Sequence, residues 1–181
     1  MKVLMLSAAA AALVAGTAPA QASVFTVGSL ASGCYQASLN YKVTPLALAD
    51  CTRALDGEPL AFDDRVATFV NRGIVRMNLG DHVGADRDFD TALGMDPNEP
   101  EAWLNKGLLR LRQNKPDAAV PLIEHAMQAR TIRPALALYA RGIANEQLGH
   151  VSQAYADLVR ARDLAPSWPL PAAQLRRYSV R

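Results

Sequence analysis

Apolar side chains recur three, four and seven residues apart along most of the chain beyond residue 60. This spacing places them on one face of an α-helix. Between residues 66 and 99 the pattern forms two such stripes, whose members are Phe69, Gly73, Ile74, Ala85, Phe89, Ala92 and Leu93. Leu79-Gly80-Asp81 separates the two stripes, and Pro97 ends the second, because the residue before a proline is pushed out of helical geometry. We therefore expect a pair of helices joined by a short turn.

The same marks recur twice further along the chain. Gly107 follows Gly73 by 34 residues, and Gly142 follows Gly107 by 35, with the extra residue in the segment 131–134. An alanine stands twelve residues after each glycine, at Ala85, Ala119 and Ala154. A fixed period of this length is typical of repeat proteins that stack helix pairs. Pro121 falls inside the second helix of the middle unit, so we expect that helix to begin late or to bend.

These marks resemble the tetratricopeptide repeat (TPR) family, whose units carry an aromatic residue at position 4, glycine at 8, alanine at 20 and 27, and proline at 32. In the first unit they fall on Phe69, Gly73, Ala85, Ala92 and Pro97. The second has Trp103, Gly107, Ala119 and Ala126 but Thr131 for proline, and the third has Leu138, Gly142, Ala154, Ala161 and Pro166. The resemblance implies an all-α fold, a right-handed α-solenoid of antiparallel helix pairs, with units at 66–99, 100–134 and 135–168. The alternative is an unrelated helical bundle.

Residues 31–60 resemble a degenerate earlier unit, since Ala47, Cys51 and Ala54 repeat the spacing of the marks in the second helices. The resemblance places Cys34 and Cys51 at positions 7 and 24, which face each other in this family. For an exported protein this implies one disulfide in an N-terminal helical hairpin within residues 23–65. A redox or metal pair is the rival interpretation, but it usually shows a Cys-x-x-Cys spacing or further ligands. At the other end, residues 169–181 are too short for another unit and are expected to form a cap or tail.

The first 22 residues have the plan of a cleaved signal peptide. Lys2 precedes an apolar run from Val3 to Ala15, and Ala20-Gln21-Ala22 is a small-x-small cleavage site. We expect cleavage after Ala22 and export, most simply to a bacterial periplasm. The run is too short for a membrane-spanning helix, which needs about 20 residues. The other interpretations are an uncleaved anchor, secretion, and a lipoprotein attached through Cys34, whose preceding residues faintly resemble a lipobox.

The composition and the absence of catalytic motifs argue against nucleic-acid binding and against enzyme activity. The formal net charge of +2 and the 6% aromatic content do not suit a general nucleic-acid binder. The three histidines form no His-Glu-x-x-His pair, and no nucleophile elbow or phosphate-binding loop occurs. We therefore expect no enzyme activity, no catalytic residue, no cofactor and no metal.

The TPR resemblance implies a concave surface lined by the first helix of each unit, which in this family often holds a peptide or a partner helix. The residues expected to face this groove are Val70, Asn71, Ile74, Met77, Leu104, Asn105, Leu108, Leu111, Tyr139 and Ile143. Apolar patches of this kind usually mark interaction sites. Val70 and Ile74 replace the Lys and Asn of the family's carboxylate-clamp members, so capture of a peptide carboxylate is not expected. Asn71 and Asn105 have two possible roles: each can stabilise the fold, or each can form a hydrogen bond with the backbone of a bound peptide.

A row of cations accompanies these positions. Arg72, Arg76, Lys106, Arg110 and Arg141 occupy matching places on the first helices, and residues four apart share a helix face. One interpretation is that their stems cover apolar surface while their heads pair with Asp86, Asp88, Asp90 or Asp157. The other is a stripe that binds an acidic ligand.

The sequence thus favours a non-enzymatic adaptor of the periplasm that binds an apolar or amphipathic segment of a protein partner in the groove. The alternative is a structural or assembly subunit of a cell-envelope complex that uses its outer face or its ends. Neither interpretation names the partner.

Overall fold

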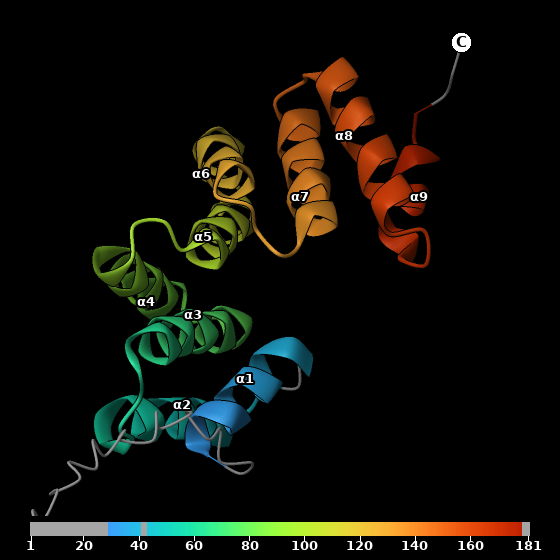
Figure 1. The fold of residues 1–181 in the computed structure, drawn as a ribbon. Helices are drawn as coiled ribbons and strands as arrows, with labels where there is room; N and C mark the ends of the chain where they lie inside the picture. Colours follow the sequence, from blue (N-terminus) through green and yellow to red (C-terminus); the bar gives the residue numbers. More distant parts are fainter. Residues whose placement is uncertain (1–28, 41–42, 179–181) are drawn as a thin grey trace, which may run out of the picture.

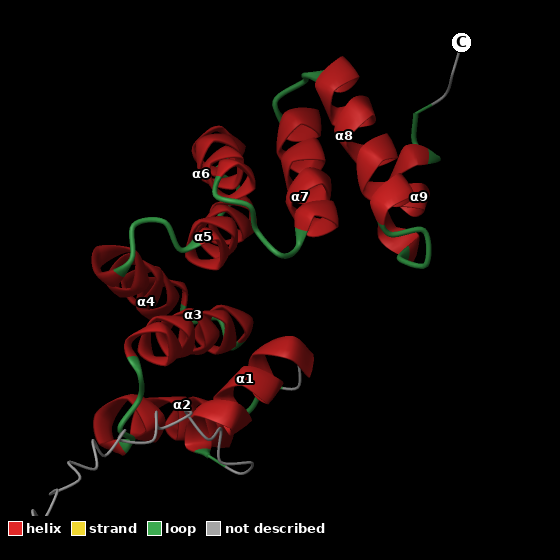
Figure 2. Cartoon of the chain, viewed as in Figure 1, coloured by secondary structure: helices red, strands yellow, loops and turns green. Residues whose placement is uncertain are grey.

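The structure, a computed structural model, describes residues 29–40 and 43–178. Within these residues the chain forms nine helices and no strands (Figure 2). They are α1 (Leu30–Asn40), α2 (Pro45–Gly57), α3 (Phe62–Asn78), α4 (His82–Met95), α5 (Pro100–Arg112), α6 (Pro116–Gln128), α7 (Pro134–Gln147), α8 (Val151–Leu164) and α9 (Pro169–Leu175). The predicted signal peptide, residues 1–22, lies outside the described residues.

Consecutive helices form hairpins that stack into an arc (Figure 1). Helices α3, α5 and α7 run along its inner side, while α4 and α6 lie on the outer side (Figure 1). Each first helix also packs on the first helix of the next hairpin, so that α3 contacts α5 and α5 contacts α7. The predicted all-α solenoid is therefore confirmed.

Each first helix ends in the same backbone motif. Gly80, Asn114 and Gly149 follow α3, α5 and α7 with φ angles of 86°, 56° and 79°. Such left-handed residues close a helix because the next N–H can then reach back to a free carbonyl of the last turn. The bond from Asp81 N to the Arg76 carbonyl is 2.9 Å long, and His150 N reaches the Asn145 carbonyl at 2.8 Å. The turn inside each hairpin is thus set locally.

The regular spacing of Gly73, Gly107 and Gly142 has a steric cause. Gly73, Gly107 and Gly142 face Phe89, Ile123 and Leu158, respectively, of the second helix in the same hairpin. A Cβ atom on Gly73 would lie 2.5 Å from the Phe89 ring, closer than real Cβ contacts allow. These three large side chains are fully buried. The absence of a Cβ therefore makes room for a large, fully buried side chain of the facing helix in each unit.

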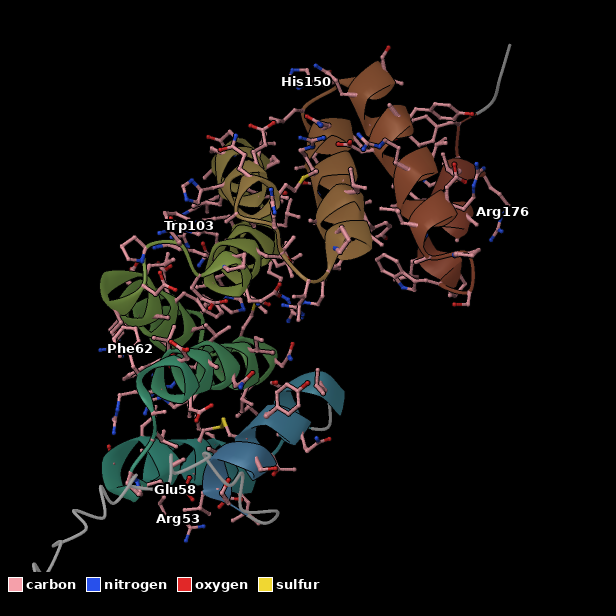
Figure 3. All side chains as sticks on the ribbon, viewed as in Figure 1. Arg53, Glu58, Phe62, Trp103, His150 and Arg176 are labelled. Atoms are coloured by element: carbon pink, nitrogen blue, oxygen red, sulfur yellow. A yellow bond between two sulfur atoms is a disulfide. The ribbon has the colours of Figure 1, made fainter. Side chains whose placement is uncertain are left out.

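The N-terminal hairpin is held by different means. Cys34 and Cys51 are fully buried and joined by a disulfide, as predicted, which links α1 to α2 (Figure 3). Thr44 caps the start of α2, since its Oγ1 accepts a hydrogen bond from Ala47 N at 3.1 Å. The carboxylate of Glu58, after α2, accepts the N–H groups of Leu30 and Ala31 at 2.7 and 3.1 Å and so caps α1.

Helix α6 corrects one expectation. It begins at Pro116, the same place in its unit at which α4 begins at His82 and α8 at Val151, so a late start is wrong. Pro116 occupies the first turn of the helix, where its missing N–H has no partner to lose. Pro121 lies inside the helix with an exposed side chain.

Candidate partner-binding surface

The first helices contact one another through a regular register. Val70, Ile74 and Met77 of α3 share a core cluster with Ala102 and Leu109 of α5. One unit later, Leu104 of α5 shares a cluster with three alanines of α7, and Leu108 and Leu111 pack against it. When residues are counted from the start of each unit (66, 100 and 135), the residues at positions 5, 9 and 12 of one unit contact residues at positions 3, 6 or 10 of the next.

This register overturns part of the predicted groove. Val70, Ile74, Met77 and Leu104 are buried in these clusters and do not face an open surface. Their apolar side chains hold one unit against the next, because a hairpin alone leaves one apolar face uncovered. Four of the predicted apolar residues, all on α5 and α7, are half-buried rather than buried: Leu108, Leu111, Tyr139 and Ile143.

The two asparagines serve the fold. Asn105 is buried, and its Nδ2 donates to the Glu101 carbonyl one turn earlier at 2.7 Å, so it is not accessible to a bound peptide. Asn71 is half-buried, and its Oδ1 accepts a hydrogen bond from Ser38 Oγ at 2.9 Å. Asn71 thereby ties α3 to the N-terminal hairpin.

Helix α9 completes the inner side after α7. Pro171 is buried, and the Trp168 ring packs edge-on against Tyr139 with centroids 4.9 Å apart. Glu146 accepts hydrogen bonds from Gln174 Nε2 at 2.5 Å and Tyr178 Oη at 3.1 Å, and it pairs with Arg177 at 3.2 Å. Desolvation and the bond to Glu146 raise the pKa of Tyr178 to about 12. Pro171, Gln174 and Tyr178 stand at positions 3, 6 and 10 of a further unit, so α9 takes the place of that unit's first helix.

A polar pocket lies between α7 and this terminal helix. It has a volume of about 440 Å³ and is lined by Ile143, Glu146, Gln147, Gln174 and Arg177. Ile143 is the one predicted groove residue among them. Arg176 lies beside the pocket-lining Arg177 in sequence and extends away from the molecule (Figure 3).

The predicted row of cations is paired within the protein. Arg72 reaches both carboxylate oxygens of Asp88 at 2.8 and 3.0 Å, and Arg76 reaches the same carboxylate at 2.9 Å. Arg141 forms the equivalent two-pronged contact with Asp157, with both N–O distances 2.8 Å. The hydrogen bond to Asp157 raises the pKa of Arg141 further above its usual range. Asp88 and Asp157 are buried, so these carboxylates depend on their partners.

The middle unit pairs its cations differently. Leu122 stands where the other two units have Asp88 and Asp157. Lys106 and Arg110 instead contact α4 of the preceding unit, Lys106 through Asp90 and Asp86, and Arg110 through Asp86 at 2.9 Å. Because the middle hairpin has no acid of its own at this position, its two cations form ion pairs with the preceding hairpin and so link the two hairpins.

A second pocket lies where sequence reasoning predicted nothing. It has a volume of about 430 Å³ and lies between the start of α7 and the end of α8. Its apolar wall includes Ile132, Pro134, Leu136, Leu164 and Trp168. The one signal in the sequence was the 35-residue length of the middle unit, because the longer loop before α7 supplies Ile132.

Glu101 holds this longer loop in place. Its carboxylate accepts Ile132 N at 3.0 Å and Arg133 Nε at 2.6 Å, and it also contacts the Thr131 hydroxyl. Thr131, which replaces the expected proline, is buried and accepts Arg133 N at 3.1 Å. The Glu101 carboxylate therefore accepts the hydrogen bonds of this loop and holds it in place. In the other units a proline at this position stiffens the chain instead.

Two other features are absent from the part of the chain that the structure describes. No group of three or more histidine, cysteine, aspartate or glutamate side chains in this part of the chain is placed to hold a metal ion. No helix in the same residues is long and apolar enough to cross a membrane.

Comparison with known proteins places the fold. No protein-family model and no curated protein matches the chain. Among solved structures, MamA from Desulfovibrio magneticus RS-1 is 24% identical with a TM-score of 0.62, and the match covers 82% of each chain. PilW, described as a widely conserved type IV pilus biogenesis factor, is 23% identical with a TM-score of 0.68, over 83% of this chain and 69% of PilW. The Cut9–Hcn1 assembly of the APC/C is 20% identical with a TM-score of 0.59, over 78% and 29%. Together with the hairpin register, these likenesses show that the chain has the fold of the TPR solenoids.

Proposed function

We propose that this protein is a non-enzymatic adaptor that binds an apolar or amphipathic segment of a partner protein along the inner side of its arc. The observation that carries the proposal is the row of half-buried apolar side chains on α5 and α7, namely Leu108, Leu111, Tyr139 and Ile143. Partly exposed apolar side chains in a row favour association with a partner. The likeness of the fold to MamA, PilW and Cut9 supports an interaction role.

We further propose that the protein acts in the periplasm of a bacterial cell envelope. The buried Cys34–Cys51 disulfide supports export, because disulfides persist in oxidising compartments. The predicted signal peptide agrees with this placement, and PilW, which has a similar fold, is described as a type IV pilus biogenesis factor. Analysis of the N-terminus of the protein recovered from a native envelope fraction tests this: a mature chain that begins at Ser23 is the expected result.

The binding surface is tested by crosslinking from single positions in the native cell. A photoreactive side chain replaces Leu108 on α5 in one variant and Val83 on α4 in a matched control, since Val83 is 69% exposed on an outer helix. We expect a discrete protein adduct from position 108 and none from position 83. Leu104 is not used, because it is buried and its replacement would unfold the unit.

The second candidate is a structural subunit that uses its outer face or its ends. It is favoured by exposed apolar side chains outside the inner row, among them Leu46 on α2 and Val151 on α8. Adducts from position 83 or 151 in the absence of adducts from position 108 would support this role and contradict the adaptor proposal.

A further inference from the structure

The apolar row on α5 and α7 is bordered by a cation, Arg112, that no acid neutralises. Arg112 is the last residue of α5 and follows Leu108 by four residues, so the two side chains share one face of the helix. Its guanidinium donates to Asn78 Oδ1 at 2.8 Å and to the Met77 carbonyl at 3.5 Å. In the part of the chain that the structure describes these are its polar contacts, and neither acceptor carries a charge.

The other arginines of the first helices are engaged differently. Arg72 and Arg141 each bind a buried aspartate, and Arg110 binds an aspartate of the preceding hairpin. Their side chains are 12–22% exposed, whereas Arg112 belongs to the exposed residues of its helix. The charge of Arg112 is therefore open to a partner that lies on the row.

The polar neighbour of Arg112 adds a second donor without an acceptor. Asn78 ends α3, and Arg112 occupies its Oδ1 atom. The Nδ2 atom of Asn78 is buried and has no hydrogen-bond partner among the described residues, an arrangement that costs free energy. Donors therefore outnumber acceptors where α3 and α5 end, which favours an acceptor that carries negative charge.

The next unit shows how such a position lies beside the row. Gln147 follows Arg112 by 35 residues and occupies the matching place on α7, where it lines one pocket together with the row residue Ile143. Glu146, the acid of that pocket, pairs with Arg177 at 3.2 Å, so its charge is neutralised within the protein. This border of the row thus presents an amide and an unpaired cation.

We infer that the partner segment bound by the apolar row is acidic: it lays bulky apolar side chains on Leu108 and Ile143 and sets an aspartate or glutamate against Arg112. The inference rests on the function proposed above and names the chemistry of its partner. A carboxylate matches a guanidinium because it can accept two parallel hydrogen bonds from it. Opposite charge also speeds the encounter, while a basic segment would place like charges together and be rejected.

The test pans a random-peptide display library against the full chain and measures the affinity of the enriched peptides by fluorescence anisotropy. We expect peptides that combine Leu, Phe or Trp with Asp or Glu. Arg112→Glu should weaken them about fivefold or more, since it replaces attraction with repulsion. Arg160→Glu is the matched control, because Arg160 is an exposed arginine on α8, outside the row, and its reversal should leave the affinity unchanged.

A charge swap separates the ion pair from damage to the fold. Peptides whose acid is replaced by lysine should bind Arg112→Glu better than they bind the wild type, which an unfolded variant cannot do. Arg112→Gln removes the charge and keeps a donor, so it should weaken the acidic peptides by about threefold and serves if Arg112→Glu melts early. Affinity for the wild type should fall as salt is raised, because exposed charges are screened.

Ile143→Ser distinguishes failure of this inference from failure of the proposed function. Peptides that lose affinity in Ile143→Ser but bind Arg112→Glu as well as the wild type, or that carry no acid, would overturn the inference and leave the adaptor function in place. Peptides indifferent to both variants, or a failure to enrich any peptide, would count against both. Sedimentation of the chain alone examines a second copy as the occupant: a dimer that dissociates in Ile143→Ser would also overturn the inference.

Discussion

Gly107 lies directly against Ile123: a Cβ atom on the glycine would stand 2.6 Å from Cγ1 of the isoleucine and 3.4 Å from the Ala119 carbonyl. Ile123 is fully buried, and the helix backbone cannot shift without opening the hairpin. The same relation joins Gly73 to Phe89 and Gly142 to Leu158, which makes it the central packing contact of each unit.

Gly107→Leu should therefore lower the stability of the chain by about 3 kcal/mol or more, at the upper end of the cost of overpacking a core. A thermal melt followed by circular dichroism measures the loss. Gly94→Ala is the matched control, because Gly94 lies in α4 with nothing within 4 Å of its Cβ position. That change should be neutral or stabilising by up to about 1 kcal/mol, since alanine is the better helix former. A melting point for Gly107→Leu within a degree or two of the wild type would contradict the account.

Asp88→Asn should cost about 3–5 kcal/mol, because it leaves Arg72 without its counter-charge and leaves Arg76 only its 3.7 Å contact with Asp81. The Asp88 side chain is only 3% exposed. Asp163→Asn removes a surface pair with Arg162 and should change stability by less than about 1 kcal/mol. Equal urea-denaturation midpoints for the two variants would show that the buried pair does not hold α3 to α4.

Loss of the disulfide in the double variant Cys34→Ala/Cys51→Ala should destabilise the N-terminal hairpin by roughly 3 kcal/mol, the chain-entropy value for a loop of this size. Each hairpin contacts only its neighbours, so the loss should be confined to α1, α2 and the adjoining face of α3. Amide hydrogen exchange resolves this, with faster exchange in α1 and α2 and unchanged protection in α7 and α8. Uniformly faster exchange would indicate that the stack unfolds as one unit.

Glu146→Ala should release α9 from the end of the stack, because it removes the acceptor of Gln174 and Tyr178 and the partner of Arg177. Limited proteolysis should then cut between α8 and α9 sooner than in the wild type. Glu124→Ala, on the outer helix α6, removes only a 3.3 Å contact with Arg141 and serves as the control. Identical cleavage of both variants would show that Glu146 does not fix α9.

Glu99→Gln should make the protein more stable at neutral pH. Burial and the neighbouring carboxylates raise the pKa of Glu99 above 4.5, so its charge opposes folding wherever it is ionised. This opposition is present above the raised pKa and is lost as the pH falls toward the unfolded value of 4.5. The melting points of wild type and variant should therefore converge on acidification, while glutamine keeps an acceptor for the Glu101 N–H. A gap that stays constant with pH would contradict this assignment.

Much of the fold follows from local marks in the sequence. The period of Gly73, Gly107 and Gly142 predicts the hairpins, because helical spacing and close packing at a glycine are properties of the segment itself. The Cys34–Cys51 disulfide, implied by family positions, is present. Pairing of the cation row with acids was one of two interpretations, and the structure pairs every member.

The binding surface was predicted less well, for a physical reason. Val70, Ile74, Met77 and Leu104 show the same apolar character whether they line a groove or hold two units together. Only the packing of α3 on α5 and of α5 on α7 decides whether such a residue lines a groove or is buried between two units. The pocket at Ile132 depends likewise on one extra loop residue and on Glu101, which lies 31 residues away in sequence.

The sequence by itself determined the helices, their pairing into hairpins and the contacts inside each hairpin, since these arise between residues a fixed short distance apart. The tertiary structure decided which apolar faces stay accessible and which acid each cation contacts. Those properties depend on how one hairpin rotates against the next, and this rotation is set by many side chains acting together rather than by any single segment.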